Sequence, residues 1–262
     1  MIHVLRTIDP MLLERNREGF LNGHTPFSAI VAFLSFYTAY LIGAEHIVLS
    51  NESSANEGNL SGASVNHQYS KSFAFEHDFQ QYAHKNLMPD IHYFSLLRPF
   101  NELQIAKYFA ALPQYHAVFR SCNAGSKRNV WCRNCAKCLF VCGILSPFLP
   151  PEQLSAIFGE NLLERDELRE IFDGLAGFSP LKPFECVGTQ EELRFALALA
   201  ARQYRARGEA LPALLQYFTQ HADWEALSSD GSLLNAWNPQ HEIPAAFQPY
   251  IKEMHNYAAG IA

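Results

Sequence analysis

The chain has 262 residues, a formal net charge of −6 and no basic run, so its composition does not favour binding to a nucleic-acid backbone. Hydrophobic residues make up 48% of the chain, which is enough to bury a sizeable core in one or two domains. The longest apolar run, residues 29–44, contains Ser35, Tyr37, Thr38 and Tyr40. It is too short and too polar at its centre for us to expect a membrane span.

Short apolar runs alternate with helical patterns over the first 120 residues, and this alternation predicts a parallel sheet covered by helices. Strands are expected over 3–8, 46–50 and 91–97, and helices over 9–19, 25–42, 66–87 and 102–112. In the helix over 66–87 the apolar positions are Phe73, Phe75, Phe79 and Tyr82.

Polar residues follow two of the expected strands. In parallel sheets ligands bind beyond the carboxyl ends of the strands, so the loop after Ser50 and the segment after Leu97 are candidate sites. The loop combines hydroxyl, amide and carboxylate groups, among them Ser50, Asn51, Glu52 and Asn56. Glu52 could hold Mg²⁺ or act as a base, because hard cations prefer oxygen ligands. An ordinary solvated loop would have the same composition.

Three further positions are candidates for binding or proton transfer. His67 and Lys71 lie four residues apart, on one face of the expected helix, and suit a phosphate or carboxylate. His24 lies where a helix is expected to begin and could contribute to anion binding there. Cys186 follows Glu185 and could act as a base. The alternatives are polar or capped helix ends and a buried structural cysteine.

Five of the six cysteines fall within residues 122–142. Four of them have the spacing of a closed tetrahedral zinc site, which is structural rather than catalytic. The spacing from the second of these to Cys142 also matches a ferredoxin run, although Gly143 stands where that run has proline. An iron–sulfur cluster and free thiols therefore remain alternatives, and Cys142 could simply face the core. The predicted zinc ligands are Cys122, Cys132, Cys135 and Cys138.

The pattern becomes helical after the cysteines, with helices expected over 139–146, 151–158, 166–175, 191–207 and 212–221. We therefore predict an α/β domain over 1–120 and a cysteine-cluster and helical region over 121–262. Clustered cysteines without a secretory signal favour metal binding in a reducing, cytoplasmic compartment over disulfides.

Six segments lie in order within about the first 200 residues: Gly23–Ala29, Ser50–Asn56, Val65–Ser72, Leu97–Ala106, Arg120–Asn123 and Lys182–Thr189. Together they resemble the UDP-N-acetylmuramoyl-L-alanyl-L-glutamate epimerases. That family is related to the PP-loop ATP pyrophosphatases, some of which share a similar four-cysteine zinc element. The fold implied is a partial PP-loop-like parallel sheet with a zinc-stapled helical region.

The resemblance implies an isomerase of peptidoglycan precursor synthesis. It would use ATP and Mg²⁺ to convert the terminal L-glutamate of a UDP-muramoyl dipeptide to D-glutamate through an acyl-adenylate. Glu52 and Asn51 would then bind nucleotide, metal or substrate. His67 and Lys71 would bind a phosphate or carboxylate or transfer a proton, and Cys186 would be a base. Ser50, Asn56 and His24 would contact the nucleotide.

The Ser-Gly-Gly-x-Asp-Ser loop of PP-loop enzymes does not occur, and residues 61–64 do not replace it. We therefore expect the chain to begin downstream of that loop, as the C-terminal portion of a longer protein. Two alternatives stay open. One is another PP-loop adenylating enzyme, either a ligase or a thiolating enzyme. The other is a non-catalytic, zinc-stabilised binding module.

Overall fold

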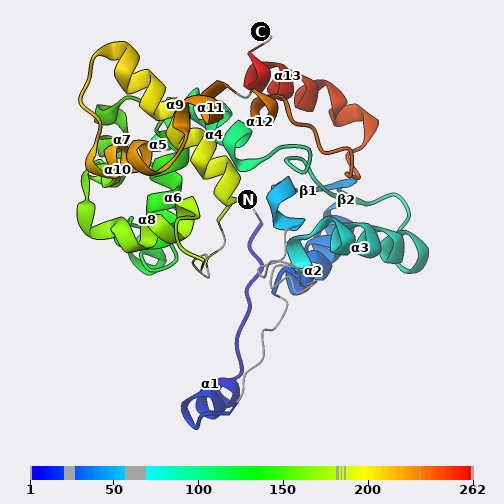
Figure 1. Cartoon of the computed structure of the whole chain (residues 1–262). Helices are drawn as coiled ribbons and strands as arrows, with labels where there is room; N and C mark the ends of the chain where they lie inside the picture. The colour runs from blue at the N-terminus through cyan, green and yellow to red at the C-terminus, as the bar shows by residue number, and fades with distance from the viewer. Residues whose placement is uncertain are drawn as a thin grey trace.

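The computed structural model describes residues 2–20, 27–56, 69–180, 183, 185, 187–229 and 231–260. Helices dominate these residues, and two short strands form the sheet (Figure 1). The strands are β1 (His46–Leu49) and β2 (His92–Ser95). The helices before the cysteines are α1 (Pro10–Arg17), α2 (Phe27–Ile42), α3 (Phe73–Asn86), α4 (Glu102–Ala110) and α5 (Pro113–His116). Those after them are α6 (Ala136–Leu145), α7 (Pro151–Phe158), α8 (Arg169–Ala176), α9 (Gln190–Arg207), α10 (Ala213–His221), α11 (Trp224–Ser229), α12 (Ser232–Asn235) and α13 (Gln248–Ala259).

The parallel pairing expected for the first region is confirmed. β1 and β2 are parallel, and His46 pairs with His92 while Leu49 pairs with Ser95. The crossover between the strands includes α3, which packs on β2. Both strands therefore end at the same edge of the sheet, next to the residues that follow Leu49 and Ser95.

The prediction of a strand over 3–8 is wrong. Residues 2–9 form no strand, and their apolar side chains face solvent, with Leu5 93% exposed. Figure 1 shows this segment leading to α1, which stands apart from the rest of the molecule. The pattern was misleading because a strand needs a neighbouring strand to satisfy its backbone groups, and none lies beside this segment among the described residues.

The helix expected over 66–87 is confirmed only in part. Within the described residues, Tyr69–Lys71 form a 3-10 turn, and the Ser72 side chain accepts a hydrogen bond from the Phe75 amide to start α3. Tyr82, expected at an apolar position, is 48% exposed. The polar side chains of Glu76 and Gln80 are buried against the sheet instead, because they hydrogen-bond to groups on β2.

The helical region after the cysteines has the largest core of the molecule. α6 and α9 pack against each other at its centre, and α8, α10 and α11 pack on α9. The helices expected over 151–158, 191–207 and 212–221 are confirmed with only small differences in their bounds. The expected helix over 166–175 begins as a 3-10 turn, Asp166–Leu168, before α8.

The last helix, which the sequence did not single out, returns to the first region. α13 packs on α4, and a separate apolar cluster forms there between Phe94, Phe100, Ile251 and Met254. The Lys107 ammonium on α4 also donates to the Ala258 carbonyl, 2.8 Å away. No helix in the described part of the chain is long and apolar enough to cross a membrane.

Candidate active-site cleft and metal centre

A buried ion pair organises the edge of the sheet where both strands end. Arg98 and Glu76 are 0% and 1% exposed, and Arg98 Nη2 lies 2.8 Å from Glu76 Oε2. The Ser95 hydroxyl donates to the same carboxylate oxygen and accepts from Asn51 Nδ2 at 3.1 Å. This network connects the end of β2 to the loop after β1.

The same guanidinium brings together two of the predicted site residues. Arg98 donates to the Glu52 carbonyl at 2.9 Å and to the Lys71 carbonyl at 2.8 Å. The two residues are 19 positions apart in the sequence, yet one buried side chain fixes both backbones. The Glu52 carboxylate also accepts a hydrogen bond from Ser54 at 3.2 Å.

A cleft of about 290 Å³ lies between this edge of the sheet and α6. Ser50, Glu52 and Leu97 line it from the sheet side, and Ser121 and Lys137 line it from the cysteine region. Most of its remaining wall is apolar and aromatic, which is typical of small-molecule pockets that have a few polar groups. The other lining residues are Glu102, Ile105, Ala106, Phe109, Phe119, Phe140, Val141, Ile144, Leu145 and Val187.

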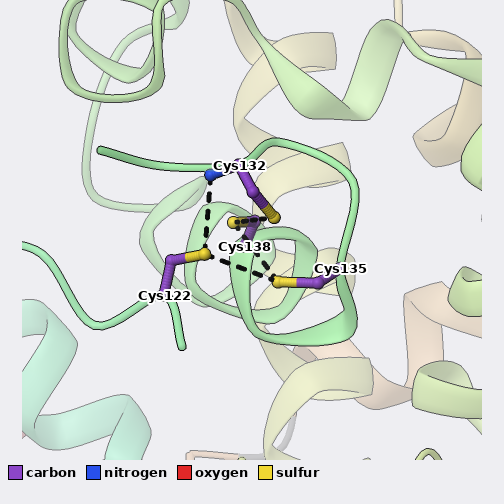
Figure 2. A group of neighbouring side chains, drawn as sticks. All are labelled: Cys122, Cys132, Cys135 and Cys138. Carbon is purple, nitrogen blue, oxygen red and sulfur yellow. Dashed lines mark hydrogen bonds between the residues drawn. The ribbon is translucent and has the colours of Figure 1, made fainter. Parts of the chain in front are cut away.

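The four predicted ligand cysteines converge in one cluster, and Figure 2 shows their sulfur atoms facing one another. All four sulfurs lie within 4.8 Å of one another. The sulfurs of Cys122 and Cys135 are 3.9 Å apart, and those of Cys132 and Cys138 are 3.7 Å apart. A single tetrahedral ion with metal–sulfur bonds of about 2.3 Å requires sulfur–sulfur distances of about 3.8 Å. With three sulfur–sulfur distances of 3.5 to 3.9 Å, the cluster could therefore hold one metal ion.

The backbone around the cluster is shaped to present the thiols. The amides of Gly125 and Cys132 donate to Cys122 Sγ at 3.2 and 3.5 Å. A Cβ at Gly125 would lie 1.8 Å from the Val130 carbonyl oxygen, so only glycine fits this close approach. Arg133, between two of the cysteines, has a positive φ of 61°. Such strained positions persist where the surrounding structure requires them.

The thiols influence one another's protonation. The hydrogen bond between Cys135 and Cys138 lowers the pKa of Cys135 to about 5 and raises the pKa of Cys138. A lowered thiol pKa favours the thiolate, the form that binds metal ions.

Cys142 is separate from the cluster, as its expected position on a core-facing helix suggested. It is fully buried on α6, and this burial raises the pKa of its thiol to about 12. A buried, protonated thiol of this kind is unreactive and serves packing.

Several predicted site residues lie outside the described residues: His24, His67 and Cys186. The backbone of Asn56 ends a 3-10 turn, Ser53–Asn56, but the structure does not describe its side chain. Two neighbours of Cys186 are described. Val187 lines the cleft, and the Glu185 carboxylate accepts a hydrogen bond from Asn123 Nδ2 at 3.1 Å.

The sequence reasoning missed the residues that link the parts of the site. Arg98 and Glu76 were not singled out, because nothing in a sequence reveals which arginine is buried beside which carboxylate. Ser121 and Lys137 were also overlooked as cleft residues. Their signal was available, since each directly precedes a predicted metal ligand.

The fold and site define a protein in which a small parallel sheet adjoins a helical unit carrying a four-cysteine centre. Family models match two stretches of the chain. Residues 1–96 match the MurL N-terminal domain and residues 118–229 match the MurL C-terminal domain. The chain belongs to the MurL family.

Three curated relatives are each named UDP-N-acetyl-alpha-D-muramoyl-L-alanyl-L-glutamate epimerase. The protein from Xanthomonas oryzae pv. oryzae is 40% identical over 80% of this chain and 49% of its own length. Those from a Micromonospora strain and from Salinispora tropica are 36% and 41% identical, over 95% and 76% of this chain and 56% and 45% of their own lengths. The chain thus spans about half the length of the curated relatives it matches. No solved structure matches it significantly.

Proposed function

We propose that this chain takes part in the ATP-dependent epimerisation of the terminal L-glutamate of UDP-N-acetylmuramoyl-L-alanyl-L-glutamate. The observation that carries the proposal is the match to both MurL domains, together with 36–41% identity to relatives named for this activity. The product would be a precursor of peptidoglycan, made in the cytoplasm.

The chemistry explains why an epimerase of this substrate would use ATP. Removing the α-proton beside an ionised carboxylate would place two negative charges on neighbouring groups. Attack of that carboxylate on the α-phosphorus of ATP, with release of pyrophosphate, gives an acyl-adenylate in which the α-proton is far more acidic. A base then removes this proton, and a proton returned from the other face inverts the centre. Hydrolysis restores the carboxylate and releases AMP. A positioned base contributes about 10²- to 10⁴-fold to such a step.

We assign the reaction to the cleft, with the sheet edge as its polar side. Glu52 would hold Mg²⁺, as carboxylates commonly do beside nucleotide phosphates, while Ser50 and Asn51 would contact the nucleotide. Lys71 would bind phosphate or a substrate carboxylate. The Arg98 hydrogen bonds to the Glu52 and Lys71 carbonyls support this assignment, because they hold both residues at one edge.

Four residues whose side chains are not described complete the proposal. His24 and Asn56 would contact the nucleotide, His67 would serve phosphate binding or proton transfer, and Cys186 would act as a base. The position of Val187 on the cleft wall supports a search for a base near this segment.

The metal would be zinc, held by the four cysteines as a structural ion. An all-cysteine set with sulfur separations close to those of one tetrahedral ion supports zinc over a cluster of several irons. Bound zinc would hold the loop over residues 122–138 in place. The division into an α/β part over 1–120, related to the PP-loop enzymes, and a helical part over 121–262 belongs to the same proposal.

The test is an assay of the purified chain with the UDP-muramoyl dipeptide, ATP and Mg²⁺, following AMP and the chirality of the product glutamate. AMP together with D-glutamate is the expected result, and Glu52→Gln should abolish both while the circular dichroism spectrum stays unchanged. A product of altered mass would favour an adenylating ligase or thiolating enzyme. Retained substrate binding without AMP under any condition would favour a binding module, which the half-length match makes worth testing.

A further inference from the structure

We propose that Lys137 and Ser121 form a phosphate-binding position in the cleft, and that the metal centre holds the two side chains in place. The proposal rests on the proposed function for the identity of the ligand, because both substrates named there carry phosphate groups. The geometry of the chain itself supplies the other steps.

The first step is the way the two residues reach the cleft. Both line it, although they lie 16 positions apart in the sequence. Ser121 directly precedes Cys122, and Lys137 directly precedes Cys138. Since the sulfurs of these two cysteines belong to one cluster within 4.8 Å, a bound metal ion fixes the separation of the two segments. The centre is therefore adjacent to the cleft along both segments.

The second step is the state of the two polar groups. The Ser121 hydroxyl oxygen is buried and has no hydrogen-bond partner within the described ranges. A buried hydroxyl without a partner destabilises the fold, so a ligand that accepts its hydrogen bond is favoured. Of the salt bridges among the described residues, none involves Lys137. An ammonium and a hydroxyl that share a cleft wall can both donate to the oxygens of one phosphate group.

The third step is the rest of the cleft. Glu52 lies on its sheet side, and Mg²⁺ is commonly bound by one or two carboxylates together with substrate phosphates. Phe109, Phe119 and Phe140 give the cleft an aromatic wall. Its volume of about 290 Å³ is at the small end for ligand sites, so it suits part of a nucleotide rather than a whole UDP-muramoyl dipeptide. A magnesium-bound phosphate beside the aromatic wall fits these features together.

Binding measurements test the phosphate position directly. Lys137→Met should weaken binding of the phosphate ligand about 10-fold or more, and Ser121→Ala about 2- to 10-fold, by isothermal titration calorimetry. Two probes, magnesium–ATP and the UDP-muramoyl dipeptide, are titrated separately. The probe whose affinity falls identifies the source of the phosphate. Unchanged affinity for both probes in Lys137→Met would overturn the proposal.

A matched control excludes a general loss of charge near the metal. Lys127 is exposed and belongs to the same cysteine loop, in the 3-10 turn Ser126–Arg128, but does not line the cleft. Lys127→Met should bind both probes as the unaltered chain does. The metal content of all variants, measured by mass spectrometry, should be equal, so that a change in affinity reports on the side chain alone. A loss of affinity in Lys127→Met equal to that in Lys137→Met would also overturn the proposal.

A second measurement tests the role of the metal without unfolding the protein. If the metal centre holds the phosphate-binding side chains, then bound phosphate must in turn stabilise the centre, because coupling between two sites is reciprocal. A saturating concentration of the probe that binds should slow zinc release from the zinc-loaded chain to a chromogenic chelator. Lys137→Met, at the same nucleotide concentration, should lose this protection. Equal release rates with and without the probe in the unaltered chain would overturn the coupling.

These outcomes are distinguishable from failure of the proposed function. A chain that binds ATP through Lys137 but produces no D-glutamate would uphold the inference and refute the epimerase activity. A Lys137→Met variant that epimerises normally would refute the inference and uphold the epimerase activity.

Discussion

α2 and α9 are the two longest helices that the structure describes, and they differ in how they meet solvent. α9 is buried in the main core around most of its circumference, through residues that include Leu193, Phe195 and Leu197. α2 is more apolar in sequence, yet only Ala32, Phe36 and Ala39 are buried, while Tyr37 and Leu41 are 61% and 62% exposed. A helix that is apolar on every side normally lies within a larger core. Among the described residues, α2 therefore buries much less of its apolar surface than α9 does.

The sheet, like α2, leaves apolar side chains exposed. It has two four-residue strands in the described part of the chain, and Val48 on β1 is 46% exposed. Parallel sheets usually have both faces covered, and two strands alone are marginal in water. The sheet edge is instead stabilised by the ion pair of Arg98 and Glu76 and by the packing of α13. The helical region has its large core and a four-cysteine cluster that could hold a metal ion.

The largest effect should come from the metal centre. Cys135→Ser removes one of four ligands, so we expect loss of the metal and a fall in the free energy of unfolding of about 5 kcal/mol or more. Mass spectrometry and chemical denaturation measure the two effects. Cys142→Ala is the control: because Cys142 lies outside the cluster, this variant should keep the metal. If Cys135→Ser retained its stability, the centre would not be what stabilises the helical region.

The next effect should fall on the sheet region alone. Arg98→Met leaves Glu76 buried without its partner and releases the Glu52 and Lys71 carbonyls. Breaking a buried pair in this way destabilises by about 3 to 5 kcal/mol. Hydrogen exchange should accelerate in β1, β2 and α3 while α9 stays protected. Equal acceleration in α9 would mean that the two regions unfold together.

A smaller effect is expected in the cysteine loop. Gly125→Ala places a methyl group against the Val130 carbonyl, so the loop must shift, at a cost of about 1 to 3 kcal/mol. Zinc affinity in a competition assay should fall, because the Gly125 amide no longer reaches Cys122 Sγ in the same geometry. Gly208→Ala is a comparison at a position with no atom near the added carbon, although its positive φ adds strain of its own.

The smallest effect is predicted on the exposed side of α2. Leu41→Lys should change the free energy of unfolding by less than about 0.5 kcal/mol, as most surface substitutions do. Phe36→Ala, on the buried side of the same helix, should cost about 3 to 5 kcal/mol. Thermal unfolding of both variants measures the difference. A large loss with Leu41→Lys would show that this side of α2 is covered in solution.

Local signals in the sequence predicted much of the fold. α7 agrees with its expected range because Pro150 and Pro151 mark its start and Gly159, at a positive φ of 89°, ends it. α9 agrees because Thr189 and Glu192 form a capping box and Gly208 ends the helix. The four cysteines were predicted as a group because metal ligation requires them to meet at one point, whatever the fold around them.

What the sequence did not reveal depends on contacts between distant segments. Three contacts join elements that lie far apart in the sequence or that face each other only after folding. They are the ion pair of Arg98 with Glu76, the hydrogen bond that buries Gln80, and the packing of α13 on α4. Periodicity predicted that Tyr82 lies on the buried side of its helix. Instead, Glu76 and Gln80 of α3 face the sheet, because they accept hydrogen bonds from groups on β2. The cleft has the same origin, since its walls come from the sheet edge, α4, α6 and Val187.

The segment over 231–260 has one further consequence, for the stiffness of the molecule. Its Leu233 and Ala236 carbonyls accept hydrogen bonds from Asn101, which caps α4, and from Gln104 on α4. Its Glu242 contacts His77 on α3 at 2.6 Å. The segment thus crosses from the helix next to the cleft to the outer layer of the sheet. The segment thereby links α3 to α4 through contacts at both helices. Residues 231–260, none of which lines the cleft, therefore resist movement of its α4 wall relative to the sheet layer.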